Sequence, residues 1–118
     1  MSENIIETKS FDFSIQIIQT YKSLISEKRE FVLSKQLVRS GTSIGANVSE
    51  AVHGQSTKDF IHKLKISRKE ANETLYWLKL LRATDFLAQE TASKLIKLCD
   101  ELMRILTSII KTVESKLK

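Results

Sequence analysis

The sequence lacks proline entirely and has only three glycines and one cysteine in 118 residues. Proline and glycine mark most turns of β-sheet and α/β domains, so their scarcity excludes folds that need many tight turns. The glycines are Gly41, Gly45 and Gly54, which lie close together, so the rest of the chain must turn without glycine. This pattern favours a few long helices joined by short connections.

Cysteine and long apolar runs are also scarce. One cysteine cannot form an internal disulfide, which favours a reducing compartment. No stretch approaches the roughly 20 apolar residues of a membrane span, and the first residues lack the basic start and apolar run of a signal peptide. We therefore expect a cytoplasmic protein without a membrane partner. Its length and its 28% of charged residues are typical of one folded domain over residues 1–118.

Apolar residues recur at spacings of three and four in four segments, which predicts four amphipathic helices. The predicted helices span about residues 5–27, 32–53, 57–84 and 88–117. Ser56 and Asp59 match a capping box at the start of the third helix, and Gly54 is expected to end the second helix in a left-handed conformation. Short connections force neighbouring helices to run antiparallel. The sequence therefore predicts an all-α, up-down-up-down four-helix bundle in a single domain.

The last predicted helix carries a second apolar seam beside the first. The members of this second seam are Ala92, Ile96, Cys99, Met103, Leu106, Ile110, Val113 and Leu117. Together the two seams cover more than the roughly 100° that a bundle helix usually turns inward. Either one wide core absorbs both seams, or the second seam packs on another subunit. We favour the subunit contact and place Ile96, Met103 and Ile110 in it.

The net charge of +5 is concentrated in one segment, because residues 55–84 carry seven lysines and arginines against three carboxylates. The basic face expected on this third helix consists of Lys58, His62, Lys65, Arg68 and Lys69. Such a face is typical of a surface for phosphate backbones. The alternative is a solvated helix face that Asp59, Glu70 and Glu73 partly neutralise. No aromatic ladder accompanies the basic face, so we expect backbone contacts without base stacking.

Small and polar residues line one side of the second predicted helix. Gly41, Gly45 and Ser49 are spaced by four and suit close helix packing. Arg39 and Asn47 belong to a polar side that either cross-links helices or lines a subunit contact or a channel. We interpret these residues as structural first.

The third predicted helix offers partners for that polar side. The candidate partners of Arg39 are Glu70, Asn72 and Glu73. Tyr76 and Trp77 are large amphipathic groups, which we expect at a packing junction.

Catalytic and metal motifs are weak. A bundle fold prompts a search for a di-iron site, which takes a Glu-x-x-His motif from each of two helices. Glu50 and His53 match this motif, and Asp59 and His62 imitate it, but Asp59 is better explained as a helix cap. Cys99 falls on an apolar seam, where a buried thiol is expected instead of a nucleophile. We predict no enzymatic activity, no metal and no cofactor, with a di-iron enzyme as a remote alternative.

Two central stretches resemble a known family. Residues 36–54 (QLVRSGTSIGANVSEAVHG) and 58–81 (KDFIHKLKISRKEANETLYWLKLL) are similar to the signature of four-helix bundle proteins encoded in 23S ribosomal RNA intervening sequences. The most specific part is the run 39–51 followed by Tyr76-Trp77-Leu78. The resemblance implies a left-handed bundle that assembles as a homopentamer with a central channel. It implies no enzymatic activity.

The chain is more distantly similar to the accessory variability proteins of diversity-generating retroelements. Those are basic pentamers that bind nucleic acid and the reverse transcriptase. We therefore predict a non-enzymatic homo-oligomer, with a pentamer favoured by the resemblance, that binds RNA or DNA through the basic face of the third helix, with RNA favoured. A scaffold that docks a partner protein without binding nucleic acid is the alternative.

Overall fold

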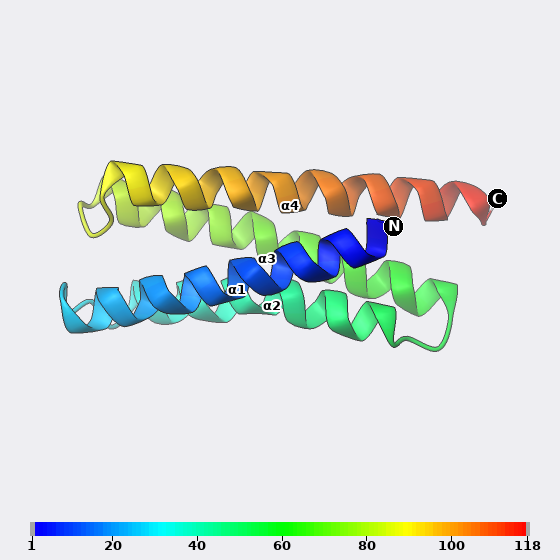
Figure 1. The fold of residues 1–118 in the computed structure, drawn as a ribbon, viewed down its shortest axis with the longest axis horizontal. Helices are drawn as coiled ribbons and strands as arrows, with labels where there is room; N and C mark the ends of the chain where they lie inside the picture. The colour runs from blue at the N-terminus through cyan, green and yellow to red at the C-terminus, as the bar shows by residue number, and fades with distance from the viewer. Residues whose placement is uncertain (1, 118) are drawn as a thin grey trace.

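The computed structural model describes residues 2–117, with side chains from residue 5 onward. Its helices are α1 (Ser2–Ser26), α2 (Leu33–Val52), α3 (Thr57–Ala83) and α4 (Gln89–Lys116). They run alternately up and down along the long axis of a molecule that measures 49 × 21 × 20 Å (Figure 1). This arrangement confirms the predicted all-α four-helix bundle. The largest difference in helix bounds is at the start of α1, which begins at residue 2 instead of 5.

Each helix packs on its neighbours in the chain, and α1 also packs on α4, so the four helices enclose one core. Phe13 and Ile17 of α1 are fully buried in this core, to which all four helices contribute aliphatic side chains. Burying one such side chain stabilises the fold by about 1.5–3 kcal/mol. Among the described helices, none is long and apolar enough to cross a membrane.

The core takes in most of both apolar seams of α4. Cys99, Leu106 and Ile110 of the second seam are fully buried, Ile96 and Met103 are partly exposed, and Leu117 at the end of the seam is exposed. The predicted subunit contact is therefore wrong for Ile110, which is 2% exposed within the single chain. The reason is geometric. Because α4 lies between α1 and α3, its two flanks are covered as well as its inner side.

The helix ends follow local hydrogen bonding. Ser56 caps α3 as predicted, because its Oγ accepts the N–H of Asp59 at 3.1 Å. The prediction of a left-handed Gly54 is wrong, since no described glycine has a positive φ. The chain leaves α2 through a tight turn at negative φ, in which the Gly54 N–H bonds to the carbonyl of Ala51 at 3.1 Å.

The N-terminus of α2 is capped by Glu30, which precedes the helix. The Glu30 carboxylate accepts the N–H groups of Val32 at 3.2 Å, Leu33 at 3.0 Å and Ser34 at 2.7 Å. The whole Glu30 residue is only 8% exposed to solvent. Burial raises the pKa of this carboxyl, but the bonds from Leu33, Ser34 and Val32 outweigh burial and hold the pKa below its ordinary value. Glu30 therefore ties the α1–α2 connection to the start of α2.

Candidate nucleic-acid interface

The outer side of α3 carries the basic residues that the sequence predicted. Leu64, Ala71 and Leu78 turn the inner side of this helix into the core, so the opposite side faces outward. Arg68 is partly buried at the edge of that outer side, and the other four predicted residues are exposed. The five residues are Lys58, His62, Lys65, Arg68 and Lys69. The fold therefore places them on one face of one helix.

Only part of this basic face is neutralised within the chain. Lys65 Nζ lies 2.7 Å from a carboxylate oxygen of Glu114 on α4, which pulls Lys65 toward that helix. Within residues 2–117, neither Lys58 nor Lys69 forms an ion pair. Glu70 and Glu73 pair with Arg39 of α2, although the charge of Lys69 also acts on Glu73 and lowers the pKa of that carboxyl. The solvated-face alternative therefore accounts for Lys65, and in part for Lys69, better than for Lys58.

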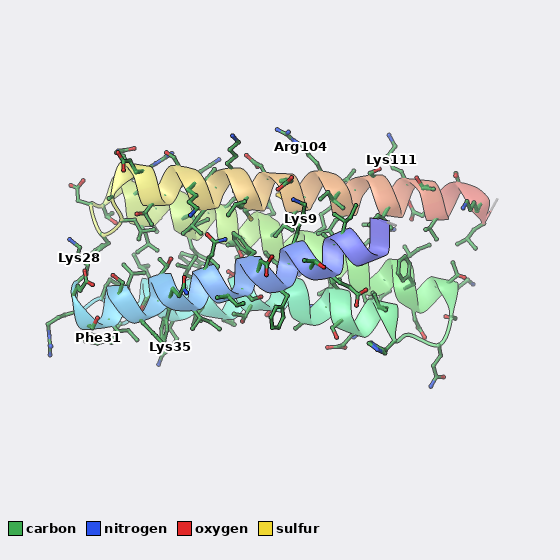
Figure 2. The ribbon with its side chains drawn as sticks, in the orientation of Figure 1. Lys9, Lys28, Phe31, Lys35, Arg104 and Lys111 are labelled. Atoms are coloured by element: carbon green, nitrogen blue, oxygen red, sulfur yellow. The ribbon has the colours of Figure 1, made fainter. Side chains whose placement is uncertain are left out.

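A second row of cations lies on the outer side of α4. Lys97, Arg104 and Lys111 are exposed and spaced by seven residues, which places them about 10 Å apart along the helix. Arg104 and Lys111 project away from the bundle (Figure 2). Two nearby carboxylates pair with neighbouring helices, Glu101 with Lys9 of α1 at 3.3 Å and Glu114 with Lys65 of α3 at 2.7 Å. Sequence analysis missed this row because residues 85–118 are nearly neutral overall, although the seven-residue spacing was a usable signal.

The net charge divides sharply between the two halves of the bundle. The α1 and α2 segments together contain four lysines and arginines and four carboxylates, so their charges cancel. The α3 and α4 segments contain twelve lysines and arginines and seven carboxylates, and 12 − 7 = +5. The α3–α4 half therefore carries a charge equal to that of the whole chain. We refer to the outer sides of α3 and α4 as the basic surface.

Arg39 links α2 to α3 beside the basic surface. Its guanidinium bonds to Glu73 and, at 3.3 Å, to Glu70, which confirms two of its three predicted partners. The third, Asn72, is exposed on the outer side of α3 and does not bond to Arg39. Trp77 Nε1 donates to Glu73 at 2.9 Å. Arg39 thus cross-links α2 and α3 within one chain, and Trp77 holds Glu73 from within α3.

The charges of this cross-link support one another. The bond from Trp77, then the bond and charge of Arg39, and finally the charge of Lys69 lower the pKa of Glu73, although burial raises it. The bond to Glu73 in turn raises the pKa of Arg39, with Glu70 adding to the effect. Both groups stay charged at neutral pH, so the cross-link holds the register of α2 on α3.

Tyr76 does not lie at the packing junction that the sequence predicted. The residue is 59% exposed and continues the outer row of α3 beyond Lys69. Trp77, its chain neighbour, does pack against the core and meets the Tyr76 ring edge-on, with 5.1 Å between the ring centres. The difference arises because consecutive helix positions point about 100° apart, so only one of the two rings can turn inward.

Small residues of α2 let α1 approach closely. A Cβ atom on Gly41 would lie 2.8 Å from Cγ2 of Ile17, and one on Gly45 would lie 3.2 Å from the carbonyl oxygen of Ser10. Asn47 donates its side-chain N–H to the carbonyl of Ser43 at 2.8 Å, within α2. The structure thus places both glycines between α1 and α2 of a single chain.

A groove of about 640 Å³ lies outside this glycine contact, between α1 and α2, and its lining combines apolar side chains such as Phe11 and Ile18 with polar ones such as Glu7 and Asp12. Phe11 of α1 lies at the edge of the groove and is 67% exposed. Ile15 and Ile18 lie on the same side of α1. Ala46 of α2 is exposed on the opposite wall. Sequence analysis missed this face, although Phe11, Ile15 and Ile18 repeat at the spacings that identified the seams of α4.

The residues examined for catalysis or metal binding are dispersed. Glu50 pairs with Lys63 at 2.8 Å, and the His53 ring nitrogen Nδ1 lies 2.9 Å from the carbonyl oxygen of Ser49. Within the described part of the chain, no three His, Cys, Asp or Glu residues are grouped to hold a metal ion. Burial, aided by the charge of Asp100, raises the pKa of the Cys99 thiol to about 12, so this thiol is protonated at neutral pH.

Comparison with known proteins places this geometry in context. The family model described as 23S rRNA-intervening sequence protein matches residues 2–108. The crystal structure of a protein of unknown function from the S23 ribosomal protein family of Bacteroides thetaiotaomicron has the same fold, with a TM-score of 0.93. The two sequences are 49% identical, and the match covers 94% of this chain and 99% of that chain. Among curated proteins, none matches.

Proposed function

We propose that this chain, which belongs to the 23S rRNA-intervening sequence protein family, is a non-enzymatic homo-oligomer that binds nucleic acid through its basic surface. One observation carries the proposal: the α3–α4 half holds a charge equal to the net charge, and most of its cations point outward. Cations on a rigid surface release counterions from a phosphate backbone, which drives sequence-independent binding. RNA is the favoured ligand.

The geometry supports contacts along two parallel rows. Lys58 and Lys69 on α3 run beside Lys97, Arg104 and Lys111 on α4. Long helices hold these cations at fixed positions, and an oligomer would repeat them on every subunit, so weak contacts would add into strong binding. Most contacts would go to phosphates, and we expect little sequence specificity.

Charge reversal tests this proposal. Lys69→Glu with Arg104→Glu is expected to weaken binding of an RNA oligonucleotide by about 30-fold at low salt and to flatten its salt dependence. The matched control is Lys22→Glu with Lys35→Glu, which changes the net charge equally on the α1–α2 half. Both control positions are exposed, and Lys35 points away from the side that carries Arg104 (Figure 2).

Fluorescence anisotropy at stepped salt measures both effects, with DNA of the same sequence as a comparison. A control variant that weakens binding as much as the test variant would contradict a localised surface. Absence of RNA and DNA binding by the unmodified protein at low salt would contradict the proposal as a whole.

Self-association is the second part of the proposal, and a pentamer is the form that the family resemblance implies. Its support is the apolar face formed by Phe11, Ile15 and Ile18, because soluble monomers rarely leave such a face in water. Since α4 buries most of its second seam, the apolar face of α1 replaces that seam as the proposed contact between subunits.

Polar substitution on that face is expected to dissociate the oligomer. Phe11→Ser with Ile18→Ser should reduce the mass measured by light scattering at micromolar concentration to the 13.5 kDa of one chain. Val32→Ser is the control, because Val32 is exposed in the α1–α2 connection, outside the groove. A 13.5 kDa mass for the unmodified protein would contradict self-association, and an unchanged mass for the variant would exclude this face.

The groove between α1 and α2, with Phe11 and Ile18 in its lining, also favours the second candidate function, a scaffold that docks a partner protein. Apolar grooves between helices commonly accept an amphipathic helix. Nuclease treatment separates the two functions, because a partner held through nucleic acid is released and a partner in the groove is retained. We propose the cytoplasm as the compartment, where the buried Cys99 thiol stays reduced.

A further inference from the structure

Tyr76 interrupts the basic surface with an exposed aromatic ring. It lies two helical turns beyond Lys69 and one turn before Lys79, on the same outer side of α3. Asn72, also exposed, lies one turn before it. The outer row of α3 therefore combines ammonium groups, an amide and a ring with more than half of its residue surface accessible. An exposed aromatic needs no explanation by itself, but this one stands among cations that attract phosphates.

The surroundings of Tyr76 limit the movement of its ring. Trp77 meets the ring edge-on, at an interplanar angle of 73°. Trp77 is in turn held by its bond to Glu73, which is fixed by Arg39 of α2. An edge-on contact covers less of a ring than parallel stacking does, which fits the high exposure of Tyr76. The ring is thus supported from one side and open to solvent on another.

We propose that Tyr76 stacks on an unpaired base, and that single-stranded nucleic acid is the preferred ligand of the basic surface. This inference rests on the proposed nucleic-acid binding. Single-strand surfaces combine a positively charged track for the backbone with aromatic rings for the bases, and the outer row of α3 provides both. Lys69 and Lys79 flank the ring and would hold the phosphates on either side of the stacked base. Bases in a duplex are stacked on one another, so a duplex would contact the cations alone.

The test compares a polyuridine oligomer with an RNA duplex of the same length. Tyr76→Ala is expected to weaken binding of the single strand by about 10-fold and to leave duplex binding within about 2-fold. Tyr76→Phe keeps a ring without the hydroxyl and should bind the single strand like the unmodified protein. Circular dichroism and light scattering check that each variant keeps its fold and its mass.

Tryptophan fluorescence gives an independent readout, because Trp77 is the only tryptophan in the chain and touches Tyr76. Binding of the single strand should quench Trp77, and Tyr76→Ala should reduce this quenching more than it reduces duplex-induced quenching. An equal loss of affinity for both ligands, no loss for either, or a lower mass of the Tyr76→Ala variant would overturn the stacking role. If the unmodified protein binds neither ligand, the proposed function fails together with this inference.

Discussion

Gly41→Leu is expected to lower the free energy of unfolding by about 3 kcal/mol, because the new side chain overpacks the contact between α1 and α2. A Cβ atom at this position would already lie 2.8 and 2.9 Å from two side-chain carbons of Ile17, which is fully buried. The added side chain has no free space, so α1 must move away from α2. Chemical denaturation at one fixed protein concentration measures the loss, because oligomers unfold at concentration-dependent midpoints.

A double-mutant cycle separates this clash from a general effect of changing glycine. Gly41→Ala gains about 1 kcal/mol of helix propensity but creates the same short contacts. Ile17→Ala removes both carbons that would be touched, and it costs about 2–5 kcal/mol on its own. The free energy of unfolding that the double variant loses should be smaller, by about 1–2 kcal/mol, than the sum of the losses of the two single variants. Simple additivity would contradict the proposed contact.

Glu30→Ala is expected to lower the free energy of unfolding by about 2 kcal/mol, near the upper limit for a helix cap. The change leaves three N–H groups at the start of α2 without their charged acceptor. Glu30→Gln keeps the shape and one acceptor oxygen, so it should cost about 1 kcal/mol. Glu27→Ala is the control, because Glu27 is an exposed carboxylate in the same connection. A similar loss for Glu27→Ala would contradict the capping role.

The contribution of Glu30 should also depend on pH. The pKa of Glu30 in the folded state lies below the ordinary value of 4.5. Between these two pKa values the unfolded state therefore binds more protons than the folded state does. The stabilisation is therefore complete above pH 4.5 and is lost as the pH falls through the lowered folded pKa. Denaturation of the unmodified protein and of Glu30→Ala at neutral pH and in acid measures this. Their difference in stability should shrink in acid, and a constant difference would contradict the prediction.

The bundle was predictable because local signals agreed along the whole chain. The lack of proline permits long helices, and Ser56 marks the start of α3 at the residue that the sequence indicated. The pairs of Arg39 with Glu70 and Glu73 were predictable as well, because few opposite charges lie on the facing sides of these two helices. Such signals depend on one helix or on two neighbouring helices.

Features that depend on how several helices pack together were not predicted. Which part of the α4 surface is buried depends on where α1 and α3 cover its flanks, and this decided the burial of Ile110. The exposure of Phe11 was missed because α1 has apolar residues on its inner and outer sides, so periodicity alone does not select one. The α4 row of Lys97, Arg104 and Lys111 was hidden by carboxylates that turn toward neighbouring helices.

The division of charge between the two halves gives the molecule an electric dipole across its short dimension of about 20 Å. A polyanion would exert a torque on this dipole before any contact forms, turning the α3–α4 half toward itself. Approach would then be oriented as well as accelerated, and added salt would weaken both effects. The groove between α1 and α2 would face away from the polyanion, so one chain would hold nucleic acid and a protein neighbour on opposite sides.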